Sequence, residues 1–205
     1  MKVMLINGSP NKNGCTFTAL SEVAKTLGEN GIDTEMVQVG GKDIRGCNGC
    51  LKCGDLKKCV IDDFVNEVAL KIDDCDGIVI GSPVYYSSAN GCLVSFLDRL
   101  FFSASYDKTM KVGAAVISAR RTGCSSAFDV LNKYFTISGM PIASSQYLNE
   151  VHGNKPDDVK KDEEGLQTMR ALGRNMAFLI KSIALGKESF GLPEKEPRVW
   201  TNFIR

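Results

Sequence analysis

Histidine is almost absent from the sequence: the single one among 205 residues is His152, which lies in a polar stretch beside Gly153 and Asn154. We expect this side chain to lie on the protein surface. The order of serine, histidine and aspartate along the sequence does not indicate a catalytic triad. No pair of carboxylates is recognisable as a general acid and a general base. The sequence therefore gives no support to catalysis by either of these side-chain arrangements.

The sequence also lacks an excess of charge of either sign and lacks a long apolar run. Its 25 basic and 24 acidic residues give a formal net charge of +1, which attracts neither nucleic acid nor a membrane. The apolar run near the N-terminus is interrupted by Gly8 and Pro10 and is too short for a secretory or transmembrane segment. We therefore expect a cytoplasmic protein without a nucleic-acid or membrane partner, whose eight cysteines form no disulfides.

Short apolar runs alternate along the chain with segments of helical period, the pattern of a parallel sheet covered by helices on both faces. The expected strands cover residues 3–6, 32–39, 77–80, 112–117 and 141–147, and the expected helices cover residues 17–27, 64–72, 91–102, 125–137 and 156–185. Such a doubly wound, five-stranded α/β sheet has the strand order 2-1-3-4-5, and its ligand crevice opens at the carboxyl ends of the first and third strands. Residues 1–185 then form one domain, and residues 186–205 form a tail that could contact another subunit.

Polar loops follow three of these strands, at the edge of the sheet where the crevice is expected. The first loop, residues 7–16, is rich in hydroxyl and amide side chains and leads into a helix N-terminus, which suits a phosphate. Its residues match neither the glycine-rich motif that binds nucleoside triphosphates nor the glycine motif of dinucleotide-binding turns. The alternative to a phosphate site is an ordinary turn without a ligand. The second loop, residues 81–90, holds two adjacent tyrosines that could flank a flat aromatic ring, and the third covers residues 118–123.

Four of the eight cysteines fall within thirteen residues, with the spacing C-x2-C-x2-C-x5-C. They are Cys47, Cys50, Cys53 and Cys59. Two-residue gaps let a tight loop turn successive sulfurs toward one soft metal centre. A 4Fe-4S cluster, a structural zinc ion and an inert loop are the three alternatives. We favour the cluster, because zinc loops usually separate two C-x2-C pairs by a longer stretch.

These motifs together resemble a known family. The similarity to the NAD(P)H-dependent FMN reductases of flavodoxin-like fold rests on Gly8-Ser9-Pro10, Asn13-Gly14-Cys15-Thr16, Ser82-Pro83-Val84-Tyr85-Tyr86, Asp98-Arg99 and Ala119-Arg120-Arg121-Thr122-Gly123. The cysteine run resembles that of the iron-sulfur flavoprotein branch, whose compact motif binds a 4Fe-4S cluster. The resemblance covers residues 1 to about 150 and implies a flavodoxin-like FMN-binding domain with the cysteine loop, residues 47–59, inserted in it.

The resemblance implies a set of FMN-binding residues. The FMN phosphate would be bound by Ser9, Asn11, Asn13, Gly14, Cys15 and Thr16. The isoalloxazine would be bordered by Pro83, Val84, Tyr85, Tyr86 and Ser87, with Arg120, Arg121, Thr122 and Gly123 on its other side. Cys15 stands where relatives commonly have asparagine or serine, and its backbone N–H is the group left to contact the phosphate.

The implied function is that of an FMN-dependent oxidoreductase. It would pass electrons from a ferredoxin-like protein or NAD(P)H to a small acceptor, through the 4Fe-4S cluster in the iron-sulfur branch. No protein side chain need act as an acid or a base. Relatives assemble as homodimers or homotetramers, so the tail with Trp200 and Phe203 is a candidate interface arm. The alternatives are a cluster-free NAD(P)H:FMN or quinone reductase and a zinc-loop redox sensor on the same scaffold.

Overall fold

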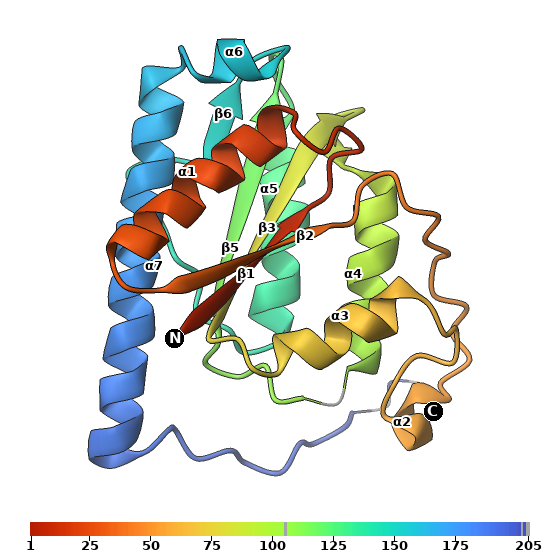
Figure 1. The fold of residues 1–205 in the computed structure, drawn as a ribbon. Helices are drawn as coiled ribbons and strands as arrows, with labels where there is room; N and C mark the ends of the chain where they lie inside the picture. The colour runs from red at the N-terminus through yellow and green to blue at the C-terminus, as the bar shows by residue number, and fades with distance from the viewer. Residues whose placement is uncertain (105, 202, 204–205) are drawn as a thin grey trace.

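A parallel β-sheet runs through the centre of the molecule in the computed structural model, which describes residues 1–104, 106–201 and 203 (Figure 1). Its strand order is β2-β1-β3-β5-β6, and the strands are β1 (Lys2–Asn7), β2 (Asp33–Gln38), β3 (Gly77–Tyr85), β5 (Val112–Ala119) and β6 (Glu150–His152). A two-residue strand, β4 (Ser88–Ala89), folds back antiparallel onto the end of β3. The parallel strands therefore follow the predicted 2-1-3-4-5 arrangement, and the predicted fold class is confirmed.

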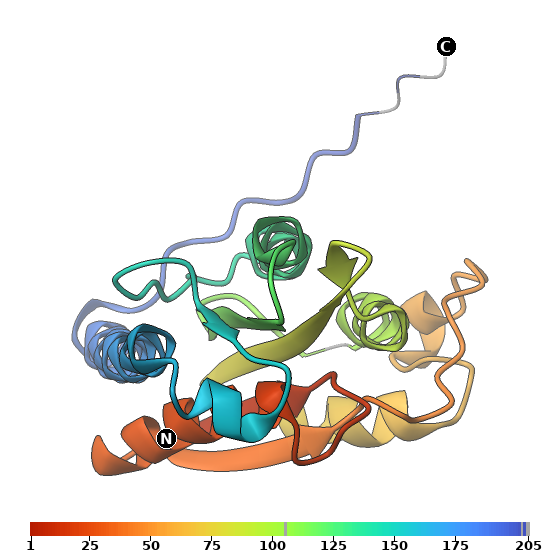
Figure 2. The same cartoon turned by 90° about the horizontal axis from the view of Figure 1, so that it is seen from above.

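Helices cover both faces of the sheet (Figure 2). One face carries α1 (Cys15–Glu29) and α7 (Glu163–Phe190), and the other carries α3 (Phe64–Ile72), α4 (Gly91–Ser103) and α5 (Cys124–Ile137). Neighbouring residues of β1 alternate between the two cores: Val3 and Leu5 pack with α1 and α7, whereas Met4 and Ile6 pack on the opposite face. Because both faces are buried, the central strands contain continuous apolar runs, and these runs are the pattern that predicted them.

The fifth parallel strand lies later in the chain than predicted. The prediction of a strand over residues 141–147 is wrong, because that segment makes only an isolated bridge between Ile142 and Gly113. The strand that pairs with β5 is β6, which lies opposite residues 117–119. Pro141 has no N–H to donate to a strand ladder, and the chain leaves the sheet after its single bridge.

The last helical segment is interrupted once and extends further than predicted. The prediction of one continuous helix over residues 156–185 is wrong, because α6 (Pro156–Val159) is separate from α7. Asp162 caps α7, since its carboxylate accepts a hydrogen bond from the N–H of Gly165 at 2.9 Å. The residues after α7 leave the helical layers as an extended, exposed segment (Figure 2). Residues 202, 204 and 205 of the predicted tail lie outside the described residues.

The carboxyl ends of the parallel strands lie at one edge of the sheet. There β1 leads into α1, β3 and β4 lead into α4, and β5 leads into α5. This connectivity places the three polar loops at the edge where ligands bind in doubly wound sheets. In the part of the chain that the structure describes, no helix combines the length and the hydropathy that a membrane crossing requires.

Candidate functional site

A buried asparagine at the end of β1 holds the first loop in place. The side chain of Asn7 is fully buried, and its Oδ1 accepts a hydrogen bond from the N–H of Ser9 at 3.1 Å. Its Nδ2 donates to Gln38 Oε1 at 2.7 Å, and Gln38 Nε2 donates in turn to the Ser9 carbonyl at 2.7 Å. Two neighbouring strand ends therefore fix the loop. Sequence reasoning missed Asn7 and Gln38 in this role, although a polar residue that ends an apolar strand is a usable signal.

The N-terminus of α1 meets this loop without a side-chain cap. Gly14 occupies the cap position and donates its N–H to the Asn11 carbonyl at 3.0 Å. The N–H groups of the first helical turn have no acceptor within the helix, and the helix dipole adds positive potential there. A Cβ at position 14 would lie 2.9 Å from the Cβ of Asn11, so a side chain would disturb the loop. Glycine thus keeps the backbone donors open to an anion, and the side chains of Asn11 and Asn13 beside them are exposed.

Two of the predicted phosphate ligands use their side chains elsewhere. Thr16 is buried, and its hydroxyl shares a hydrogen bond of 2.8 Å with Ser118 Oγ on β5. Cys15 donates its thiol to the Gly153 carbonyl at 3.6 Å, and burial raises the pKa of this thiol above its ordinary value. What both residues offer a phosphate is therefore the backbone N–H, as the sequence predicts for Cys15.

The second loop contains a strained hairpin tip between β3 and β4. Tyr85 pairs with Ser88, and the two residues between them, Tyr86 and Ser87, have φ angles of 48° and 58°. This left-handed conformation favours glycine or asparagine and costs other residues about 1–2 kcal/mol each. The Tyr86 ring at the tip is fully exposed. Backbone strain beside an exposed aromatic ring is typical of a loop shaped by a ligand or a partner.

Contacts join all three predicted loops at this edge. The N–H of Gly8 donates to the Gly81 carbonyl at 2.8 Å, which ties the first loop to the second. The threonine–serine hydroxyl pair described above ties the first loop to the third. Gly123 has a φ of +93°, and a Cβ there would lie 2.8 Å from the Ser87 Cα, so the third loop touches the second. The remaining predicted residues of these loops are half-buried or exposed: Pro83, Val84, Arg120, Arg121 and Thr122.

The four cysteines of the second predicted site line one hollow near the C-terminal end of α4. Cys47 and Cys50 are exposed, whereas Cys53, which begins the short helix α2 (Cys53–Leu56), and Cys59 are half-buried. The hollow is completed by Arg99 and other residues of α4. Helix α4 has 13 residues and begins directly after the second loop. The two predicted sites therefore lie toward opposite ends of this helix (Figure 1). A helix of 13 residues is about 20 Å long, which sets the rough distance between the sites.

A buried arginine holds the end of the cysteine loop. The side chain of Arg99 is 0% exposed, and its Nε donates to Cys59 Sγ at 3.3 Å. Its terminal nitrogens donate to both carboxylate oxygens of Asp63, at 2.7 and 2.8 Å, and to the carbonyls of Arg45 and Ile61. All five N–H donors of the guanidinium thus bind this one segment. The sequence places Arg99 only in a helix-end motif, and the fold reveals this role.

The charge of Arg99 also acts on its partner carboxylate. Burial alone would raise the pKa of Asp63, but the hydrogen bonds from Arg99 outweigh it and hold that pKa below its ordinary value. Asp63 is therefore ionised at neutral pH. Its carboxylate also caps α3 by accepting the N–H of Val65 at 3.1 Å.

Helix α3 fixes the fourth cysteine from its other side. The N–H of Cys59 donates to Asn66 Oδ1, and Asn66 Nδ2 donates to the Cys59 carbonyl, both at 3.0 Å. The backbone of Cys59 is thus bound to α3, and its sulfur is bound to α4 through Arg99. Two core helices hold this cysteine rigidly, whereas Cys47 and Cys50 lie on the exposed part of the loop.

The chain is similar to known proteins over most of its length. Residues 1–155 match the sequence profile of the family described as NADPH-dependent FMN reductase. An iron-sulfur flavoprotein of Methanocaldococcus jannaschii is 33% identical over 191 residues, which cover 89% of this chain and 99% of that protein. An iron-sulfur flavoprotein of Methanosarcina thermophila is 26% identical over 192 residues, which cover 92% of this chain and 100% of that protein.

A solved structure shares the fold. An NAD(P)H:quinone oxidoreductase from Methanothermobacter marburgensis superposes with a TM-score of 0.66 at 18% identity. The superposition covers 86% of this chain and 96% of the other. At this level of identity the likeness speaks for the fold alone.

Proposed function

Because the chain belongs to the NADPH-dependent FMN reductase family, in its iron-sulfur flavoprotein branch, we propose that it passes electrons from a ferredoxin-like donor through a 4Fe-4S cluster and FMN to a small acceptor. Its family makes it a flavin-dependent oxidoreductase that uses FMN. NAD(P)H is the alternative donor. The observation that carries the proposal is the meeting of three polar loops at the uncapped N-terminus of α1.

The first loop would bind the phosphate of FMN. The Ser9 hydroxyl oxygen accepts the N–H of Asn11 at 3.2 Å, which leaves the hydroxyl proton free to donate to an anion. The backbone N–H groups of Cys15 and Thr16 lie in the first turn of α1, where an anion also gains from the helix dipole. The exposed amide of Asn13 completes the set of donors. These groups supply binding and orientation, and the cofactor supplies both hydride and single-electron transfer.

The second and third loops would hold the isoalloxazine ring between them. Their contact at Gly123 fixes the spacing of the two loops, because a side chain at that position would strike the backbone of Ser87. Tyr86 presents an exposed ring at the hairpin tip, which can stack on a flat ligand. Arg120 and Arg121 are exposed on the third loop and add positive charge near this edge.

The cysteine loop suits a 4Fe-4S cluster better than a single zinc ion. No three of its four sulfurs, all within the described residues, lie within 4.8 Å of one another. Zinc binds thiolates at about 2.3 Å, so its tetrahedral sulfur ligands lie only about 3.8 Å apart. A four-iron cluster is larger and takes ligands that stand further apart. The guanidinium of Arg99, which donates to Cys59, would offset part of the negative charge of four thiolates.

A homodimer or homotetramer would bring the two sites together across an interface. Within one chain they lie about 20 Å apart. The surface around the cysteine loop exposes apolar side chains, with 69% of Leu51, 62% of Phe102 and 83% of Ile137 accessible. A hollow lined partly by these residues lies beside Cys47. Apolar patches of this kind are typical of interfaces, and a second copy that docked its FMN-binding edge here would place its FMN near this cluster.

Anaerobic purification tests the proposed function. Protein prepared without oxygen should contain about one FMN, about four iron atoms and about four sulfides per chain, measured by absorbance and elemental analysis. A reduced ferredoxin-like protein and NADPH are then compared as donors by following the bleaching of the flavin. Zinc without flavin would contradict the proposal and favour the redox sensor. FMN without iron would favour the cluster-free reductase.

Replacing Cys50 by serine should abolish the binding of iron and sulfide while FMN binding is retained. The reason is that Cys50 lies in the loop at the far end of α4 from the FMN-binding edge. Cys92→Ser is the matched control, because this half-buried thiol donates to the Lys42 carbonyl at 3.2 Å and lies outside the loop. If Cys50→Ser lost FMN together with iron, the arrangement in two separate sites would be wrong.

A further inference from the structure

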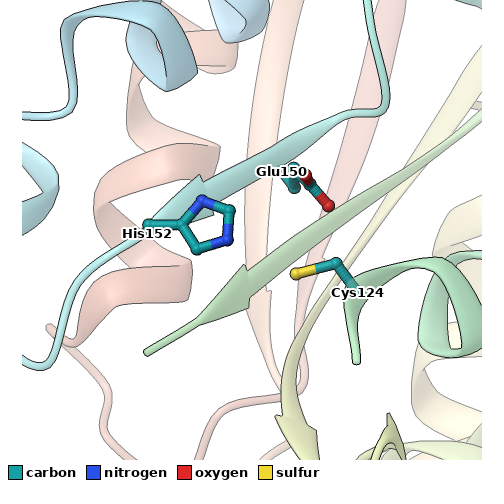
Figure 3. A group of neighbouring side chains, drawn as sticks. All are labelled: Cys124, Glu150 and His152. Atoms are coloured by element: carbon teal, nitrogen blue, oxygen red, sulfur yellow. The ribbon is translucent and has the colours of Figure 1, made fainter. Parts of the chain in front are cut away.

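Three side chains of kinds that can bind a metal meet at the carboxyl ends of β5 and β6, next to the third loop (Figure 3). The sulfur of Cys124, a carboxylate oxygen of Glu150 and an imidazole nitrogen of His152 all lie within 4.8 Å of one another. Among the described residues no other three side chains of this kind lie so close, the four-cysteine loop included. None of the three residues takes part in the binding proposed for FMN or for the iron–sulfur cluster.

Rigid elements place these side chains. Glu150 and His152 are two residues apart on β6, so both point to the same face of the sheet, where α5 packs (Figure 3). Their backbones pair with residues 117 and 119 of β5. The N–H of His152 also donates to Asp162 Oδ2 at 2.7 Å. Cys124 is the first residue of α5. Side chains that project from strands and from the N-terminus of a helix stay at fixed distances from one another, because no loop has to reorganise for them to meet.

We propose that Cys124, Glu150 and His152 bind one divalent transition-metal ion of the zinc class. Thiolate, imidazole and carboxylate are the ligands that such ions take, whereas magnesium and calcium select oxygen ligands alone. Three protein ligands leave the fourth tetrahedral position to water or a small anion. Cys124 is buried and His152 is exposed, so the ion enters from solvent past the imidazole.

Binding exchanges a proton for the ion. Burial raises the pKa of the Cys124 thiol to about 12, and the Glu150 carboxylate beside it adds to the shift, so the thiol is protonated at neutral pH. When the ion binds, the S–H bond breaks, an S–metal bond forms and the proton passes to solvent. The thiolate and the carboxylate then carry two negative charges that balance the divalent ion. The release of one proton per ion distinguishes this site from surface carboxylates, which are already ionised.

Titration of the full-length protein with Co²⁺, followed by displacement with Zn²⁺, tests this site. Beyond any metal bound at the four-cysteine loop, wild-type protein should release one proton for the ion bound at this site and show the thiolate-to-cobalt absorption of this site. Cys124→Ser should lose the proton release and absorption that belong to this site. His152→Ala should keep the thiolate ligand but bind the ion about tenfold more weakly or worse. Every variant keeps the same four-cysteine loop, so metal bound there cancels in the comparison.

Two features keep the test decisive. His152 is exposed, so His152→Ala preserves the fold even if Cys124→Ser perturbs the buried start of α5. Cys92→Ser removes a thiol elsewhere and should titrate like the wild type. Equal affinity, proton release and absorption in the wild type, Cys124→Ser and His152→Ala would overturn the proposal. Loss of affinity in His152→Ala with unchanged absorption in Cys124→Ser would exclude the thiolate ligand and overturn it as well.

Discussion

Asp63→Asn should lower the free energy of unfolding by about 3–5 kcal/mol, the cost typical of a buried charge left without its partner. The guanidinium of Arg99 has no exposed side-chain surface, and Asp63 is the one carboxylate bonded to it within the described residues. An amide keeps a hydrogen-bond acceptor but not the negative charge, so an unbalanced cation stays in the core. Unfolding in urea, followed by circular dichroism, measures the difference.

Two comparisons separate this effect from a general loss of surface charge. Glu29→Gln removes the partner of Lys25 in an exposed pair at 3.9 Å and should cost less than about 0.5 kcal/mol. The double variant Asp63→Asn with Arg99→Met removes both charges and should recover part of the loss, because no ion then stays unpaired. A loss below about 1 kcal/mol in Asp63→Asn would show that the buried pair does not hold the loop.

The pH dependence of the same pair gives a second readout. Burial works to raise the pKa of Asp63, but the hydrogen bonds from Arg99 overcome it and lower that pKa below the ordinary value of about 3.9. A carboxylate whose pKa is lowered in the folded state stabilises the fold above its unfolded pKa. This contribution is lost as the pH falls through the folded pKa. The difference in stability between the wild type and Asp63→Asn should therefore be constant near neutral pH and shrink below about pH 4.

The sheet was predictable where its strands are long and buried on both faces. Residues 3–6 and 77–80 are continuous apolar runs, because each side chain packs into one of the two cores. The fifth strand was missed because β6 has three residues, two of them polar, and gives no apolar run. Its pairing is set by the end of β5 and by Asp162 at the start of α7, which are tertiary contacts.

Residues of the candidate sites could be grouped from the sequence alone where they lie close together in it. The cysteine spacing and the polar loops after successive strands are local patterns, and they indicate metal and phosphate chemistry directly. The partners Asp63 and Arg99 are separated by 36 positions, so their ion pair leaves no pattern in the sequence. Cys124 and His152 likewise meet only because α5 begins beside the strand ends. Side chains that come together from distant parts of the sequence can be identified as a group only once the fold is known.

Gly40→Ala should weaken FMN binding about 10- to 100-fold, because overpacking of about 1–3 kcal/mol falls on the loop that we propose binds the phosphate. A Cβ at position 40 would lie 2.1 Å from the Ser9 carbonyl carbon and 2.5 Å from the Gly8 carbonyl oxygen. Both are backbone atoms, so no side chain can rotate to make room. The loop must move from the position that Asn7 and Gln38 give it, and the moved loop no longer fits the phosphate.

The matched control is Gly28→Ala on α1. A Cβ there meets no atom within 4 Å, and alanine is the better helix former, so stability should rise by about 0.5–1 kcal/mol with FMN affinity unchanged. Fluorescence titration of FMN-free protein gives the affinities, and urea unfolding gives the stabilities. Equal FMN affinity in the two variants would mean that the phosphate is not bound by the loop between β1 and α1. A loss of FMN affinity in Gly40→Ala alone would support binding of the phosphate by this loop. The two substitutions add the same methyl group and differ only in the atoms that this group contacts.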